Sequence, residues 1–237
     1  MLKLLALLFG ALKFGKLLPA VATMLLSIAV YASVFGWWYA AGFVALLLVH
    51  EMGHYLAARR RGLNVGLPTF IPFVGAWIQL KELPHDAETE AYVGIAGPLM
   101  GTAGALACFY LARSTASTLL LALAYAGFFL NLFNLIPLAP FDGGRVTAAI
   151  SPRLWLIGVP VLVALFFYRP SPLLILMAVL ALPNVMKAWR GLRSPEEHAY
   201  YSVRPETRLS YATLYLGLAA FLAIMCEQLH AELPHTH

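Results

Sequence analysis

Long stretches with almost no charged side chains place the strongest limit on how this chain can fold. A helix needs about 20 apolar residues to cross the roughly 30 Å hydrocarbon core of a bilayer. Seven apolar stretches approach or reach that length. They cover residues 17–36, 37–58, 91–112, 118–138, 154–168, 171–186 and 210–226. The sequence therefore predicts an all-α fold, a polytopic membrane helix bundle of about six to seven spans. The short fifth and sixth stretches either cross or form a re-entrant pair.

The composition excludes several classes of protein. Apolar residues make up 61% of the chain and charged residues 11%, against about 45–50% and about 25% in soluble domains. The mean hydropathy of +0.78 agrees with this bias. A soluble globular enzyme, a disordered tail and a nucleic-acid-binding module are thereby excluded. We expect the lipid bilayer as a partner and no nucleic acid.

The positions of the basic residues predict the orientation in the membrane. If the N-terminus lies inside, fourteen of the sixteen Lys and Arg residues fall in inside segments, and only Arg113 and Arg169 fall outside. Cytoplasmic loops of membrane proteins carry such an excess of positive charge. Trp37, Trp38 and Tyr39 begin the second stretch, where an aromatic belt at the outer interface is expected. We therefore expect the N-terminus on the cytoplasmic side.

The chain divides into three parts by charge and hydropathy. Residues 1–16 carry three lysines among leucines, a pattern typical of an amphipathic segment on the membrane surface. Residues 17–145 form the expected membrane core with its preceding span. Residues 146–237 supply accessory spans and a tail.

The connection between the second and third stretches has a different composition. Residues 62–82 are rich in β-forming side chains interrupted by Gly and Pro, which predicts a short β-like loop at the membrane interface. One edge of this loop could pair with an extended substrate by strand addition. Alternatively, the loop only rests on the bilayer.

A charged motif interrupts the second stretch, where charges are costly and usually functional. His50-Glu51-Met52-Gly53-His54 has the pattern H-E-x-x-H. The spacing puts His50 and His54 on one face of a helix, where they can share a metal ion. Glu51 lies beside them and can deprotonate a water on that metal, for which zinc is the best match. The alternative is that hydrogen bonds alone satisfy the two histidines.

A second unusual segment ends the fourth stretch. A zinc ion held by two histidines needs a third protein ligand, and Asp142 is the one acidic residue at this membrane edge. The second and fourth stretches both run toward the inside, so Asp142 and the histidines meet on one side. Pro137 and Pro140 break the helix before it. Asp142 could instead be a turn residue paired with Arg145, and Asn134 could serve either a reacting oxyanion or a contact between helices.

The two motifs together resemble the site-2 protease family, zinc metalloproteases that cut peptide bonds inside the membrane. The resemblance rests on H-E-x-x-H in one span and N-x-x-P-x-x-P-x-D-G-G, at residues 134–144, in a later one. It covers residues 37–145, the three-span catalytic core of that family. A glycine-proline segment at residues 96–101 in the third span is also similar.

The resemblance implies roles for individual residues. His50, His54 and Asp142 would hold one zinc ion per chain, Glu51 would be the catalytic base and acid, and Asn134 would assist substrate binding or the oxyanion. The implied function is an intramembrane zinc metalloprotease that hydrolyses peptide bonds within or near transmembrane segments. The substrate would be a membrane protein or a transmembrane peptide, and the active site would open on the cytoplasmic side, with a prokaryotic plasma membrane as the expected location.

Two rival interpretations remain open from the sequence. One is a non-catalytic, metal-binding membrane scaffold. The other is a membrane metallopeptidase of another H-E-x-x-H class, in which a glutamate supplies the third ligand. No later glutamate has the helix-breaking context that surrounds Asp142.

Overall fold

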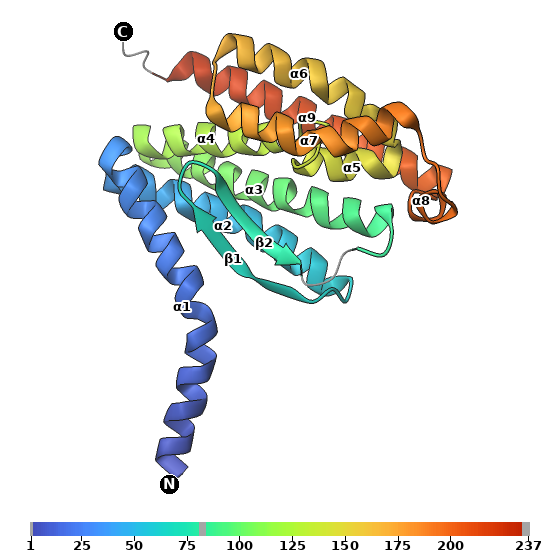
Figure 1. Cartoon of the computed structure of the whole chain (residues 1–237). Helices are drawn as coiled ribbons and strands as arrows, with labels where there is room; N and C mark the ends of the chain where they lie inside the picture. Colours follow the sequence, from blue (N-terminus) through green and yellow to red (C-terminus); the bar gives the residue numbers. More distant parts are fainter. Residues whose placement is uncertain (1, 81–83, 234–237) are drawn as a thin grey trace.

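The computed structural model describes residues 2–80 and 84–233, without the side chains of residues 2–16 and 77–80. Most of the described chain is helical, and the helices lie side by side with a small sheet on one flank (Figure 1). The elements are α1 (Leu2–Phe35), α2 (Trp37–Arg60), β1 (Val65–Ile71), β2 (Gly75–Leu80), α3 (Ala87–Thr115), α4 (Thr118–Asn134), α5 (Asp142–Ile150), the short 3-10 turn η1 (Pro152–Leu154), α6 (Trp155–Tyr168), α7 (Pro172–Arg190), α8 (Pro195–Tyr200) and α9 (Pro205–Glu232).

The predicted membrane helix bundle is confirmed. Five helices among the described residues are long and apolar enough to cross a membrane, judged by length and composition. They are the part of α1 from Leu17, then α2, α3, α7 and α9. The helix α4 and the segment Pro152–Tyr168 are apolar but shorter. The count of six to seven spans therefore stays a prediction, and so does the division at residues 16 and 145.

The N-terminal part of the chain is helical without a break. α1 runs from Leu2 to Phe35, so the lysine-bearing residues 2–16 continue directly into the first span. Because their side chains lie outside the described part of the chain, the predicted amphipathic surface segment is untested. Only the second half of α1 lies against the rest of the molecule, and its N-terminal end projects away (Figure 1).

Helix α3 lies at the centre of the bundle and packs against α2, α4 and α5. Small residues allow these close contacts, since a Cβ at Gly94 would meet Arg145 of α5, and a Cβ at Gly53 would meet the backbone of Ala96. Helix α9 packs on α4 and α5 from the other side. The four helices α2 to α5 thereby form a tightly packed unit, and α6 and α7 pair with each other at its edge (Figure 1).

The short helix α8 is tied to the bundle by polar contacts. The hydroxyl of Tyr200 donates to Glu90 of α3 at 2.7 Å. Burial and the adjacent carboxylate raise the pKa of Tyr200, so this hydroxyl remains a donor. The guanidinium of Arg208 donates to the carbonyls of Ile150, Tyr201 and Val203. These bonds fix the end of α5 against the start of α9.

The β-like segment predicted between the second and third spans is an antiparallel hairpin. β1 and β2 pair with Thr69 opposite Trp77 and Ile71 opposite Gly75. The hairpin runs back along α2, and its turn lies near the α1–α2 connection (Figure 1). The backbone N–H of Phe73 in that turn donates to the hydroxyl of Tyr31 at 3.0 Å. Tyr31 lies about 6 Å before the C-terminal end of α1. The turn of the hairpin is therefore attached near the end of the first span.

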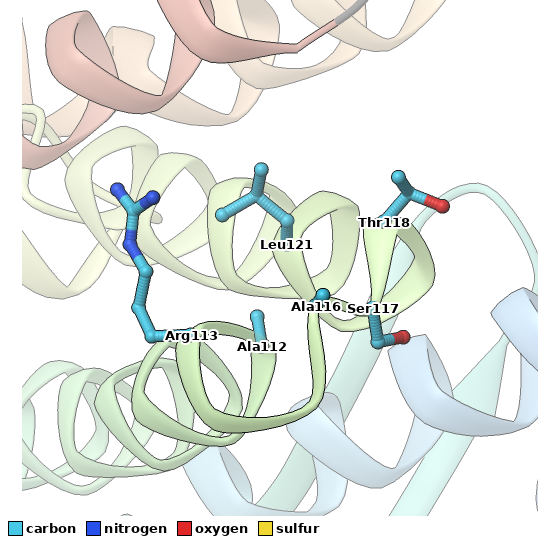
Figure 2. Close-up of a pocket in the computed structure, with 6 residues that line it drawn as sticks. All are labelled: Ala112, Arg113, Ala116, Ser117, Thr118 and Leu121. Atoms are coloured by element: carbon cyan, nitrogen blue, oxygen red, sulfur yellow. The ribbon is translucent and has the colours of Figure 1, made fainter.

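A small pocket lies at the connection between α3 and α4 (Figure 2). Its volume is about 270 Å³. Its lining residues are Ala112, Arg113, Ala116, Ser117, Thr118 and Leu121. Its lining residues on α3 begin at Ala112, about four turns beyond Gly97, which lies next to His54, so the pocket is not part of the candidate site.

Candidate metal centre

The predicted ligand residues come together at one buried point. The Nε2 atoms of His50 and His54, both on α2, lie 3.2 and 3.1 Å from Oδ2 of Asp142, the first residue of α5. The two Nε2 atoms lie 3.1 Å from each other. All three residues are buried, with exposed fractions of 3% for His50, 6% for His54 and 7% for Asp142. Residues 92 and 88 positions apart in sequence thus form one compact triangle of donor atoms.

The triangle fits a zinc ion. Ligand atoms about 2.0–2.1 Å from a tetrahedral zinc lie roughly 3.3 Å apart, close to the three distances of 3.1, 3.1 and 3.2 Å observed here. Two imidazoles and one carboxylate are a ligand set that zinc prefers, and three protein ligands leave a fourth position for chemistry. The cluster formed by His50, His54 and Asp142 is therefore suited to one Zn²⁺ ion per chain.

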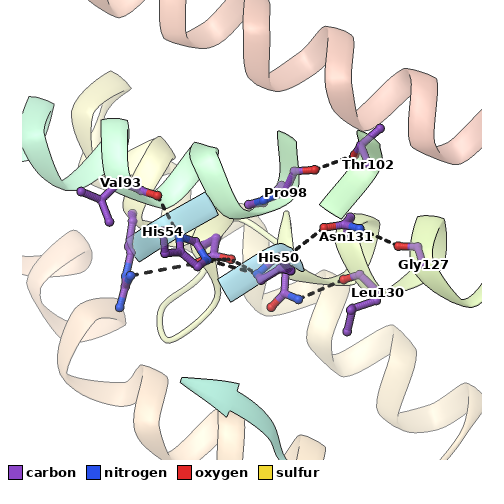
Figure 3. A network of polar contacts seen from close by, with 11 residues as sticks. His50, His54, Val93, Pro98, Thr102, Gly127, Leu130 and Asn131 are labelled. Carbon is purple, nitrogen blue, oxygen red and sulfur yellow. Dashed lines mark hydrogen bonds and ion pairs between the residues drawn. The ribbon is translucent and has the colours of Figure 1, made fainter. Parts of the chain in front are cut away.

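Both imidazoles are oriented by hydrogen bonds at their other nitrogen. Nδ1 of His54 donates to the backbone carbonyl of Val93 on α3 at 2.8 Å. Nδ1 of His50 contacts Oδ1 of Asn131 on α4, also at 2.8 Å. Figure 3 shows these contacts on either side of the histidine pair. Since each Nδ1 carries the proton, each Nε2 presents a lone pair to the centre.

The connection from α4 to α5 brings Asp142 to the histidines. Helix α4 ends at Asn134, and α5 begins at Asp142 after the proline-containing turn. A Cβ at Gly143 would overlap the backbone of Leu135, and one at Gly144 would overlap that of Ala139. The two glycines therefore let α5 fold back closely on the turn.

The other oxygen of Asp142 faces a cation. Oδ1 lies 3.9 Å from Nη1 of Arg145, one turn along α5. The alternative of a turn residue paired with Arg145 and the predicted metal-facing role are thus both compatible with this geometry, because each uses a different oxygen. We note that Oδ2 makes the shorter contacts.

Glu51 lies on α2 next to His50 and is 5% exposed. Within the described part of the chain, it makes no hydrogen bond or ion pair. A carboxylate at this depth in an apolar helix costs free energy, and such groups are common at functional sites. The role of Glu51 as the base stays a prediction.

The two asparagines of α4 have different surroundings. Nδ2 of Asn134 donates to the carbonyl of Leu130 in its own helix at 3.0 Å. Its predicted contact with substrate or oxyanion is therefore still a prediction. Asn131, by contrast, contacts the imidazole of His50 on the neighbouring helix α2. A buried amide and a buried imidazole in neighbouring apolar spans each need a hydrogen-bond partner. The sequence could have indicated this contact through that need.

The glycines of α3 do more than permit helix packing. A Cβ at Gly104 would contact the aliphatic side chains of Val49 and Leu46, as expected for packing alone. A Cβ at Gly97 would instead overlap the ring of His54, and one at Gly101 would overlap the amide of Asn131. These two positions thus make room for the site.

Comparison with known proteins agrees with this geometry. Residues 38–116 match the family model described as Peptidase family M50. The chain is 32% identical over 116 residues to "Zinc metalloprotease MJ0392" of Methanocaldococcus jannaschii, an alignment that covers 47% of this chain and 33% of the relative. It is 36% identical over 146 residues to "Putative zinc metalloprotease Rip3" of Mycobacterium tuberculosis, covering 55% of this chain and 36% of the relative.

A solved structure, "Site-2 Protease from Methanocaldococcus jannaschii", superposes with a TM-score of 0.47 at 22% identity, covering 76% of this chain and 87% of that one. The chain spans only about a third of the length of the two curated relatives. The family match includes the whole H-E-x-x-H motif. The predicted resemblance is confirmed: residues 38–116 match the model of Peptidase family M50, and the chain is similar to curated zinc metalloproteases.

Proposed function

We propose that the protein is an intramembrane zinc metalloprotease that hydrolyses peptide bonds within or near transmembrane segments of membrane proteins. The observation that carries this proposal is the buried triangle of two imidazole nitrogens and one carboxylate oxygen beside a buried glutamate. The two imidazoles and the glutamate lie on α2, a helix of membrane length, and the carboxylate of Asp142 joins them from the start of the short helix α5. Charged and metal-binding groups at such depth are costly unless they serve a function.

In this proposal His50, His54 and Asp142 hold one zinc ion. Zinc in such a site polarises a carbonyl group and makes water acidic enough to attack it near neutral pH. Glu51 accepts the proton of the attacking water and later donates it to the leaving amine nitrogen. The burial of Glu51 keeps this proton transfer away from bulk water. Hydrolysis consumes one water molecule, whose hydroxyl adds to the carbonyl carbon and whose other proton goes to the amine nitrogen as the peptide bond breaks.

Substrate binding is assigned to two other features. A peptide bond inside a helix is shielded by its own hydrogen bonds, so the substrate has to be locally extended before cleavage. The free edge of the hairpin offers backbone groups to which an extended peptide could be added as a further strand. Asn134, at the end of α4, is proposed to assist the bound peptide or the developing oxyanion.

We further propose that the protein resides in a prokaryotic plasma membrane with its N-terminus and the opening of its active site on the cytoplasmic side. The basic residues Arg59 and Arg60 close α2 just beyond His54. Because cytoplasmic segments carry the excess of Lys and Arg, the metal centre lies nearer that side. His54 is about 8 Å along the helix from Arg59.

A comparison of wild type with Glu51→Gln tests the proposal. Purified protein in detergent micelles is incubated with synthetic transmembrane peptides that carry a fluorophore and a quencher. We expect cleavage by the wild type that a chelator abolishes and added zinc restores, and no cleavage by Glu51→Gln. The variant should retain its zinc, because Glu51 is not among the proposed ligands.

Equal cleavage by Glu51→Gln would exclude the proposed mechanism. Cleavage by neither protein, with zinc bound to both, would favour the metal-binding scaffold. Full retention of zinc by Asp142→Ala would favour the other H-E-x-x-H class, in which a later glutamate is the third ligand.

A further inference from the structure

Asn131 is the most completely buried polar side chain next to the metal centre, with 1% of its surface exposed. It lies on α4 and contacts Nδ1 of His50 at 2.8 Å across the helix interface. We infer that Asn131 is a positioning residue for the metal: it holds the imidazole of His50 in the tautomer and orientation that direct Nε2 toward Asp142. The inference rests on the zinc site of the proposed function and assigns a support to one ligand.

The hydrogen bonds around Asn131 determine where the protons lie. Nδ2 of Asn131 donates to the carbonyl of Gly127 at 2.6 Å. Because a carbonyl only accepts, this bond points the amide nitrogen at Gly127 and leaves Oδ1 facing His50. Oδ1 also only accepts, so the shared proton belongs to Nδ1 of His50. A neutral imidazole carries one proton, and the lone pair is therefore on Nε2, the atom in the donor triangle.

The two histidines are supported in the same way by different chemistry. The Nδ1 atom of His54 donates to the backbone carbonyl of Val93, and that of His50 to the side-chain carbonyl of Asn131, both at 2.8 Å. Partners of this kind orient metal-bound imidazoles and raise their basicity. A backbone carbonyl cannot be removed by substitution, whereas an asparagine can. The support of His50 is thus the one that can be tested directly.

The surrounding helices are shaped to hold this amide. Oδ1 of Asn131 lies where a Cβ at Gly101 of α3 would stand. The amide therefore fills a space that only glycine leaves open, with α2, α3 and α4 all in contact at this point (Figure 3). Its hydrogen bond to Gly127 fixes it from its own helix. An amide held on three sides keeps one rotamer, which a positioning role requires.

The test measures zinc affinity rather than proteolysis. Wild type, Asn131→Leu and Asn131→Asp are purified in detergent, stripped of metal and titrated with zinc in competition with a chromophoric chelator. Leucine keeps the size of the side chain and removes the acceptor, so we expect roughly 10- to 100-fold weaker zinc binding. Aspartate can still accept from Nδ1 of His50, and we expect it to retain most of the affinity although it loses the bond to Gly127.

A matched control separates positioning from stability. Thr102 of α3 is buried and donates its hydrogen bond to the carbonyl of Pro98 in its own helix at 2.6 Å, not to a proposed ligand (Figure 3). Thr102→Val should lower the melting temperature of the metal-free protein and leave zinc affinity unchanged. If Asn131→Leu does not fold, Asn131→Ser replaces it, since a shorter hydroxyl cannot reach Nδ1 of His50.

The outcomes divide clearly. Weak zinc binding by Asn131→Leu, recovery in Asn131→Asp and normal binding in Thr102→Val would support the inference. Unchanged affinity in Asn131→Leu, or equal losses in the aspartate and leucine variants, would overturn it. A failure of the proposed function looks different, because a wild type that binds zinc but cleaves no peptide would leave these affinity differences intact.

Discussion

The metal centre and the pair formed by α1 and the hairpin both place polar contacts among apolar helices, but they are held in different ways. At the centre, α2 to α5 approach closely, and each imidazole has partners at both nitrogens. Along α1, single hydroxyls accept from the hairpin: Thr23 from the N–H of Phe70 in β1, and Tyr31 from that of Phe73 in the turn. In the most apolar 18-residue segment of each helix, 50% of the residues of α2 are buried, against 11% of those of α1.

This difference separates a rigid region from a weakly attached one. Groups with several partners in a close-packed interior keep one arrangement, which a metal site needs. Elements with few buried contacts open at lower free-energy cost. Between Thr23 and Tyr31, the hydroxyl of Ser27 is buried without a hydrogen-bond partner among the described residues and so adds no bond to these two. We therefore expect substitutions at the centre to affect zinc, and substitutions at α1 and the hairpin to spare it.

Loss of a ligand should have the largest effect on the centre. Asp142→Ala removes one corner of the donor triangle, so we expect zinc to fall from about one ion per chain in the wild type to nearly none. Zinc is measured by elemental analysis of the purified protein. Asp86→Ala is the matched control, since that carboxylate accepts from the N–H of Thr89 at the start of α3. It should cost about 1 kcal/mol of stability and no zinc. Full retention of zinc in Asp142→Ala would require another third ligand.

A single methyl group should disrupt the centre almost as strongly. Gly97→Ala would place a Cβ in the ring of His54, and overpacking of this kind costs about 1–3 kcal/mol. We expect a lower melting temperature and loss of tight zinc binding. Gly104→Ala, on the same face of α3, would meet only Val49 and Leu46 at 3.2 and 3.3 Å, which can adjust. It should retain zinc. Equal zinc binding in both variants would mean that the ring of His54 can move aside freely.

The centre was more predictable from the sequence than the weaker region. The i, i+4 pair of histidines needs only one helix, and the count of spans places Asp142 on the same side. The contact of Asn131 with His50 depends on how α4 is rotated about its axis, and a helix that is apolar all round does not indicate this. The position of the hairpin depends on hydroxyls such as that of Tyr31, whose partners are backbone groups and leave no pattern in the sequence.

A proline scan of β2 tests whether the hairpin binds substrate. Proline removes a backbone N–H. In an antiparallel pair the N–H groups of successive residues face the partner strand and the outer edge in turn, so a scan of Trp77, Ile78, Gln79 and Leu80 removes possible donors to an added strand at every second position. Each lost hydrogen bond of about 1 kcal/mol should lower kcat/KM by roughly fivefold. Zinc content should not change, because no ligand lies in the hairpin. Unchanged cleavage across the scan would leave the alternative of a loop that only rests on the bilayer.

The smallest effect is expected where one hydroxyl holds the hairpin turn. Tyr31→Phe removes the acceptor for the N–H of Phe73 but keeps the ring contacts with Phe43 and Phe73. We expect a loss of about 0.5–1 kcal/mol in stability and faster hydrogen exchange at the Phe73 amide. The amide of Phe70, which donates to Thr23, is the internal control. Since this region is held by independent single contacts, exchange at Phe70 and zinc affinity should not change. A simultaneous loss of zinc would mean that the two regions form one cooperative unit and that the contrast between them is false.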